Sequence, residues 1–281
     1  MKKFMKKNGS EVIRTAIQIL FLLTLPSAFS SAFAAVKGVG EAFGQGDILT
    51  VTPFVKILLF LLLFTCIFGR FFCGYACAFG AVCDWIYKLS AFLQKKTGKK
   101  LPAIPVRVQR LLQALKYAVL AGILLLCVLG YAKSINGNSP WTLFSRILSG
   151  EMGGEDFVIA GILLAGIGIL SAFAERAFCQ YLCPMGAVFS LMPVLPTGQL
   201  LRDREHCIKG CSLCERICPT ALSLGEEAFR NGECIRCNRC ASRCPVKNIS
   251  VRPSRFRPEE PVWTIVLAVV LFAALKFVIG M

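Results

Sequence analysis

The chain has 281 residues, 56% of them hydrophobic, and a mean hydropathy of +0.64. Soluble domains average about 45–50% apolar residues, so the composition predicts a membrane protein. The single histidine, His206, is too few for a bis-histidine haem, and we expect no haem here and a surface position for His206. A net charge of +16 would suggest nucleic acid for a soluble protein, but its distribution along this chain excludes that interpretation.

Five apolar segments predict transmembrane helices. Each approaches the ~20 residues that cross ~30 Å of hydrocarbon, although the second and fourth are slightly short. The segments run over 12–34, 53–69, 111–132, 157–175 and 262–280. Residues 1–35 also have the basic start, apolar middle and small-residue end of a cleavable signal peptide, but we expect a retained anchor.

Lysine and arginine predict the orientation of these segments. Residues 1–14, 86–110 and 200–261 together hold 24 of the 32 basic residues. All three regions fall on one side of a five-span arrangement, so the N terminus is predicted to be cytoplasmic and the C terminus to lie outside. The excess of basic residues then sets the orientation, and these residues are expected to contact anionic lipid. We expect a multi-pass protein of the cytoplasmic membrane.

The membrane region contains an internal repeat. Residues 70–82 read RFFCGYACAFGAV and residues 176–188 read RAFCQYLCPMGAV, with eight of thirteen positions identical. Each copy follows two apolar segments and an outer loop, which predicts a duplicated two-helix unit in one orientation. Parallel repeats are usually related by an axis along the membrane normal. Such an axis would bring the cysteine pairs of the two copies face to face.

Two runs of four cysteines follow the second copy. Cys234-x2-Cys237-x2-Cys240-x3-Cys244-Pro245 has the bacterial ferredoxin spacing, and the run from Cys207 to Pro219 has one extra residue in its first gap. The last cysteine of such a run ligates the other cluster. The spacing therefore predicts one [4Fe–4S] cluster on Cys207, Cys211, Cys214 and Cys244, and a second on Cys234, Cys237, Cys240 and Cys218. Two structural zinc sites are the alternative, although zinc motifs more often combine two Cys-x2-Cys pairs.

The membrane cysteines offer a third site. Cys73/Cys77 and Cys179/Cys183 are each spaced i, i+4, so on a helix both thiols of a pair would share one face. Four thiolates suffice for a third cluster, and the repeated Arg70 and Arg176 would offset its negative charge. A redox-active thiol or metal role, and simple packing as small hydrophobic residues, remain open alternatives. A disulfide is disfavoured on the reducing cytoplasmic side.

The order of these features resembles the NapH-type membrane ferredoxins of periplasmic nitrate reduction and the membrane core of NosR-type polyferredoxins. The resemblance covers about residues 50–281. Pro184 fits the family pattern of a proline after the second membrane cysteine, whereas Ala78 departs from it. The resemblance implies electron transfer between the quinone pool, or a cytoplasmic donor, and a partner redox system. It also implies quinone as a ligand, for which no residue of the chain can be named.

Together these observations predict a membrane all-α fold of about five transmembrane helices, with an inserted cytoplasmic α+β domain of the two-cluster bacterial ferredoxin type. The expected divisions are 1–199 for the membrane domain, 200–258 for the ferredoxin domain and 259–281 for the last helix. The favoured function is an electron-transfer subunit of a membrane oxidoreductase complex of quinol dehydrogenase type, without catalytic residues of its own. The alternatives are an accessory polyferredoxin that reduces a metal or senses redox state during assembly of another enzyme, and a zinc-stabilised scaffold.

Overall fold

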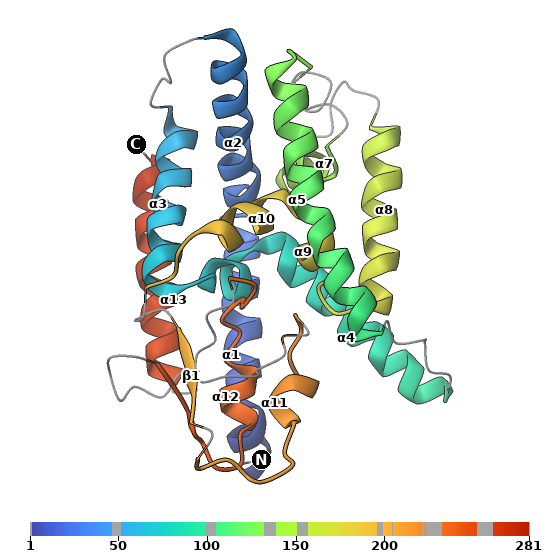
Figure 1. The fold of residues 1–281 in the computed structure, drawn as a ribbon, viewed down its shortest axis with the longest axis vertical. Helices are drawn as coiled ribbons and strands as arrows, with labels where there is room; N and C mark the ends of the chain where they lie inside the picture. The colour runs from blue at the N-terminus through green and yellow to red at the C-terminus, as the bar shows by residue number, and fades with distance from the viewer. Residues whose placement is uncertain are drawn as a thin grey trace.

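Most of the longer helices run along the long axis, and a small region built from residues 199–251 lies at one end of the molecule (Figure 1). It is taken from a computed structural model, which describes residues 2–46, 52–98, 105–131, 139–150, 157–195, 199–203, 205–220, 222, 232–251 and 261–280. The N terminus lies at the end that carries the small region, and the C terminus lies toward the opposite end (Figure 1).

Four of the five predicted apolar segments are helices close to their expected bounds. They are α3 (Pro53–Phe68), α5 (Val106–Val128), α8 (Val158–Phe173) and α13 (Pro261–Gly280). Of these, α5 and α13 are long and apolar enough to cross a membrane, whereas α3 and α8 are shorter apolar helices. Thr52 begins α3 by accepting a hydrogen bond from the Val55 N–H at 3.4 Å, and Pro53 occupies the first turn, where no partner for its nitrogen is needed.

The apolar segment 12–34 is not one continuous helix. The chain forms α1 (Lys2–Thr24) and α2 (Ala28–Gln45), and the two are bent by 65° at the break between them. Pro26 explains the break, because proline lacks an N–H and disfavours helical geometry at the residue before it. Within the described residues two helices qualify as spans, or three if α1 and α2 form one broken span. The number five therefore stays a prediction.

The two copies of the repeat have matching local structure. Copy one consists of the π-helix η1 (Phe72–Ala76) followed by α4 (Ala78–Thr97), and copy two of α9 (Ala177–Tyr181) followed by α10 (Pro184–Leu191). Phe79 and Phe178 join the copies, with ring centroids 4.5 Å apart. A further helix, α7 (Pro140–Ser149), lies between α5 and α8, in a stretch where residues 132–138 and 151–156 lie outside the described residues.

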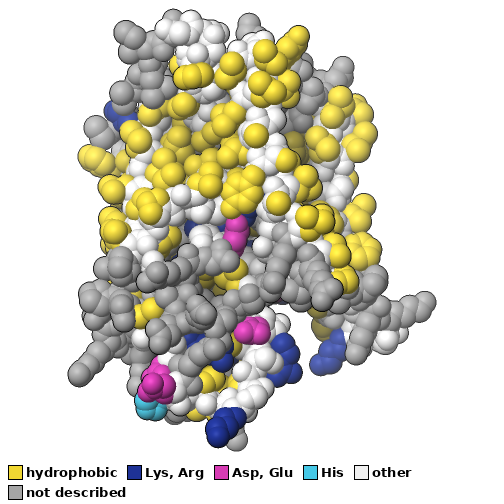
Figure 2. Space-filling view, viewed as in Figure 1, with side chains coloured by type: hydrophobic (Ala, Val, Ile, Leu, Met, Phe, Trp, Pro, Cys, Tyr) yellow, Lys and Arg dark blue, Asp and Glu magenta, His cyan; other side chains and the backbone are white. Residues whose placement is uncertain are grey.

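The small region contains both strands and helices. Strands β1 (Leu200–Arg202) and β2 (Ile249–Val251) pair antiparallel, and the short helices α11 (Leu213–Arg216) and α12 (Arg239–Arg243) lie between them in sequence. A small apolar core holds the region together: Leu200, Leu222, Ala241, Ile249 and Val251. Its expected end at residue 258 lies outside the described residues. Figure 2 shows hydrophobic side chains over most of the helical part of this face and most of the visible charged ones near the small region.

Candidate functional site

The second cysteine of each membrane pair caps a helix. Cys77 precedes α4 with ψ 112, and its Sγ accepts a hydrogen bond from the Gly80 N–H at 3.5 Å. Cys183 precedes α10 with the same ψ, and its Sγ accepts from the Gly186 N–H at 3.2 Å. The expectation of one continuous helix face is therefore wrong, because the extended backbone at Cys77 and Cys183 ends one helix and starts the next. The N-terminal end of a helix therefore lies beside each of these sulfurs.

The fold brings the two membrane pairs together. Cys73 and Cys183 lie near Cys77, and Cys77 and Cys183 lie near Cys179. Cys77, Cys179 and Cys183 are buried, and Cys73 is partly buried. The cysteine pairs of the two copies thus lie near each other, as copies related by a two-fold axis would place them, and among the described residues no three of these thiols converge on a single metal ion.

Each of the two repeated arginines lies against the other copy of the repeat. Arg176 of copy two donates hydrogen bonds to the carbonyl oxygens of Cys73 and of Gly74, the latter at 3.3 Å. Arg70 of copy one lies against copy two, where a Cβ at Gly186 would come 3.2 Å from its Nη2. Both arginine side chains are fully enclosed. Arg176 therefore fixes the backbone of copy one, whereas Arg70 lies against copy two and donates to the Gly232 carbonyl oxygen at 3.0 Å.

Arg176 belongs to a buried ion cluster centred on Asp84. The Asp84 carboxylate accepts from Arg176 Nε at 2.7 Å, from Arg14 Nη2 at 2.6 Å and from Gln18 Nε2 at 2.9 Å. Burial alone would raise the pKa of Asp84, but Arg176 and Arg14 outweigh it and lower this pKa well below its usual range. Asp84 is therefore ionised and holds two cations beside the first cysteine pair.

A second ion cluster surrounds Glu233, one residue before Cys234. Its carboxylate accepts a hydrogen bond from Arg70 Nη1 at 3.4 Å, another from the Lys116 ammonium, and one from the Tyr117 hydroxyl at 3.0 Å. Lys116 is fully buried. The two clusters have the same composition, one carboxylate between two cations, and each leaves one positive charge in excess.

The sequence contained a signal for these clusters that the predictions missed. Arg14 and Gln18 lie inside the predicted span 12–34, and Lys116 lies inside the predicted span 111–132. Charged residues inside apolar segments are rare and usually mark a site or a partner. The partner of Lys116 lies 117 residues away, so only the fold could identify it.

The eight cysteines of the small region line two separate cavities. One cavity is lined by Cys207, Cys211, Cys214 and Cys244. The other is lined by Cys218, Cys234, Cys237 and Cys240. In each, the last cysteine of one run joins the first three of the other, which is the grouping that the spacing predicts. Among the described residues no three Cys, His, Asp or Glu side chains converge on a single metal ion, and these cysteines instead stand around the cavity walls.

The two cavities differ in their surroundings. At the first, the Arg202 guanidinium donates to Cys207 Sγ at 3.3 Å and lowers the pKa of this near-surface thiol. At the second, burial raises the pKa of the Cys234 thiol to about 12. A buried thiol of this kind binds metal only with loss of its proton. The first cavity is thus the outer one and the second the enclosed one.

The second cavity is fixed directly to the first membrane motif. Gly74 lies so close to the small region that a Cβ there would come 2.4 Å from the Ile235 carbonyl oxygen. The Tyr75 hydroxyl donates to the Cys237 carbonyl oxygen at 3.4 Å, and Asn238 Nδ2 donates to the Tyr75 hydroxyl at 3.4 Å. The loop that carries three cysteines of this cavity therefore rests on the membrane cysteine motif.

Comparison with known proteins extends this picture. A family of 4Fe–4S binding domains matches residues 51–100 and 157–196, and each stretch contains one membrane cysteine pair. An uncharacterised protein of Methanocaldococcus jannaschii is 31% identical over 237 residues, covering 84% of this chain and 85% of its own length. The ferredoxin-type protein NapH of Haemophilus influenzae is 29% identical over 216 residues, covering 72% of this chain and 67% of NapH.

The chain belongs to the NapH/NosR-type polyferredoxin family. The regulatory protein NosR of Pseudomonas aeruginosa is 27% identical over 169 residues, which cover 60% of this chain and 23% of NosR. No solved structure matches. Membership in this family, the 4Fe–4S match and the apolar helices make the chain an iron–sulfur membrane protein of the electron-transfer type.

Proposed function

We propose that this chain is a membrane electron-transfer subunit that holds two [4Fe–4S] clusters in residues 207–244 and relays electrons between the quinone pool, or a cytoplasmic donor, and a partner redox complex. The observation that carries the proposal is the grouping of eight cysteines around two cavities, four to each. Cys207, Cys211, Cys214 and Cys244 would hold one cluster, and Cys218, Cys234, Cys237 and Cys240 the other. A cluster supplies one-electron redox chemistry when bound.

A third cluster on Cys73, Cys77, Cys179 and Cys183 is part of the proposal. An oxidised [4Fe–4S] core held by four thiolates carries a net charge of about −2, which is costly to bury without compensation. The ion clusters around Asp84 and Glu233 each hold two cations against one carboxylate. The two ion clusters together carry two net positive charges, which would balance the negative charge of such a core. The 4Fe–4S family match at both cysteine pairs supports the same assignment.

The positions of the cysteines suggest the order of the sites. The enclosed cavity rests on the first membrane motif through Gly74 and Tyr75, and the cavity with Cys207 is farther out. Helices α9 and α10 and the start of α4 lie near the middle of the helical part, and α11 and α12 lie near the N terminus (Figure 1). A quinone or another subunit would therefore complete the path across the apolar layer. We place the small region, taken as residues 200–258, and the N terminus on the cytoplasmic side, as the basic residues predict. The membrane part then comprises residues 1–199 and 259–281.

Anaerobic purification in mild detergent tests the proposal. The preparation should contain about 12 iron atoms per chain for three clusters, and dithionite should produce the EPR signals of reduced [4Fe–4S] centres. Zinc without iron, or an absence of dithionite-reducible signals in folded protein, would refute it. Subunits that are recovered with the chain would identify the partner complex and separate the relay from an accessory role in enzyme assembly.

A further inference from the structure

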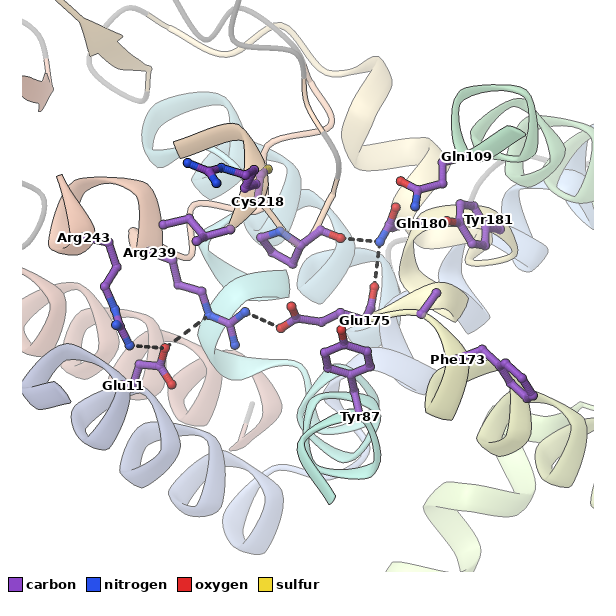
Figure 3. Close-up of a pocket in the computed structure, with 14 residues that line it drawn as sticks. Glu11, Tyr87, Gln109, Phe173, Glu175, Gln180, Tyr181, Cys218, Arg239 and Arg243 are labelled. Carbon is purple, nitrogen blue, oxygen red and sulfur yellow. Dashed lines mark hydrogen bonds and ion pairs between the residues drawn. The ribbon is translucent and has the colours of Figure 1, made fainter. Parts of the chain in front are cut away.

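The residue after the first cysteine of copy two reaches the small region through its side chain. This residue is Gln180, which follows Cys179. Its Nε2 donates one hydrogen bond to the Pro219 carbonyl oxygen and another to the Glu175 carbonyl oxygen, the latter at 2.7 Å. Figure 3 shows the Gln180 side chain between Glu175 and the loop that carries Cys218. Pro219 directly follows Cys218, so one hydrogen bond joins the neighbour of a membrane cysteine to the neighbour of an enclosed-cavity cysteine.

The equivalent residue of copy one makes a matching connection through its backbone. Gly74 follows Cys73 and aligns with Gln180 in the repeat. A Cβ on Gly74 would lie 2.4 Å from the Ile235 carbonyl oxygen, so only glycine allows the two backbones to come this close. Ile235 directly follows Cys234, another cysteine of the enclosed cavity. Both copies thus place the residue after their first cysteine against a carbonyl oxygen next to a cysteine of the enclosed cavity.

Both contacts are buried and fixed in orientation. Gln180 is 5% exposed, and its two neighbours are carbonyl oxygens, which only accept, so the amide must turn its N–H groups toward them. The Gly74 carbonyl oxygen accepts from Arg14 Nε at 3.1 Å and from Arg176 Nη2 at 3.3 Å. At both positions the small region therefore touches the membrane motif directly.

We propose that these two contacts form the junction at which electrons pass between the enclosed site and the membrane site, with Gln180 as a positioning residue. This junction rests on the proposed function, because each of the two sites must hold a cluster. The path from Cys218 to Cys179 is covalent except for the single hydrogen bond from Gln180 to Pro219. A hydrogen bond couples two redox centres more strongly than a through-space gap does. One electron leaves the reduced site and enters the oxidised one, and no bond forms or breaks.

The test compares two glutamine variants of the full-length, cluster-loaded chain in detergent. Gln180→Met keeps an unbranched side chain but removes both N–H donors. Gln113→Met is the matched control, because Gln113 Nε2 donates to the Thr220 carbonyl oxygen at 3.0 Å from α5, outside the repeat. Each variant removes one hydrogen bond to the same loop. Hydrogen exchange of the peptide that contains Cys218 and Thr220 should therefore rise by about fivefold in both.

Only Gln180→Met should weaken the coupling between the two sites. In dithionite-reduced wild type, the magnetic interaction between the enclosed and membrane clusters should give EPR features that are missing from Cys73→Ser/Cys179→Ser, which lacks the membrane site. Gln180→Met should at least halve these features at unchanged iron content, whereas Gln113→Met should retain them. Gly74→Ala displaces the Ile235 carbonyl oxygen and should reduce the features as well, and it decides the outcome if Gln180→Met loses iron.

Three results would overturn the junction. They are equal EPR features in Gln180→Met and Gln113→Met, unchanged features in Gly74→Ala, and wild type with the iron of three clusters but no interaction features. In each of these cases the iron content still supports the proposed function. Wild type with the iron of only two clusters would instead overturn the membrane cluster, and the junction with it. Failure of one proposal is therefore distinguishable from failure of the other.

Discussion

Asp84→Asn removes the central charge of the first ion cluster with little change in side-chain volume. The Asp84 carboxylate accepts four hydrogen bonds, of which Arg176 donates two and Arg14 and Gln18 one each. An asparagine oxygen accepts about two, and its NH2 group would face guanidinium N–H groups instead of accepting from them. Arg14 and Arg176 would then be buried without an anion.

The expected loss of stability is about 3–5 kcal/mol, the usual cost of breaking a buried ion pair by removing one partner. For a chain of this size that corresponds to a fall in Tm of about 10 °C. The lowered pKa of Asp84 means that its stabilisation is complete above the unfolded value of ~3.9 and is lost only as the pH falls below that value. The loss in the variant should therefore be constant between about pH 6 and pH 8.

The assay is thermal unfolding of wild type and variant in the same detergent, with the iron content of each measured beforehand. Because Arg176 holds the Cys73 and Gly74 carbonyl oxygens, iron should also fall toward the content of two clusters. Asp203→Asn, an exposed carboxylate in the small region, is the matched control and should change Tm by less than about 1 °C. A Tm shift below about 2 °C for Asp84→Asn would refute the role assigned to this ion cluster.

Three further predictions concern the contacts between the small region and the helices and the metal that the cysteines bind. Gly74→Ala should displace the Ile235 loop, because the added Cβ would lie 2.4 Å from a carbonyl oxygen, and limited proteolysis should then cleave the small region faster than in wild type. Glu233→Gln leaves Arg70 and Lys116 without an anion and should cost about 3–5 kcal/mol, measured as a Tm shift against an exposed Glu205→Gln control. An iron chelator applied under dithionite should release iron and expose about 12 titratable thiols, whereas a zinc scaffold would release zinc.

The sequence predicted the regular elements well wherever local pattern determines them. Apolar runs located α3, α5, α8 and α13, since burial in hydrocarbon and helix length are properties of a continuous segment. The break between α1 and α2 was missed, although Pro26 marks it, because apolar side chains continue on both sides. The cysteine runs predict two groups of four ligands from the ferredoxin spacing, and the same cysteines line two cavities, but that these groups hold clusters stays a prediction.

The site was only partly accessible to sequence reasoning. The repeat indicated that two cysteine pairs belong together, but the helix break at Cys77 and Cys183 depends on capping geometry that an i, i+4 spacing does not reveal. The exchange of Arg70 and Arg176 between copies, and their partners Glu233 and Asp84, arise from contacts across roughly a third to more than half of the chain. Such pairings require the packed structure.

Iron counting in a cysteine double variant tests the central claim most directly. Wild type prepared anaerobically should hold about 12 iron atoms per chain, and Cys73→Ser/Cys179→Ser should hold about eight while retaining the EPR signals of the two clusters in the small region. Cys66→Ser, which changes a cysteine outside the proposed sites, is the control and should retain the full content. Unchanged iron in the folded double variant would contradict the membrane cluster. If the iron content also stayed unchanged in a folded Cys218→Ser/Cys244→Ser variant, the account as a whole would be contradicted.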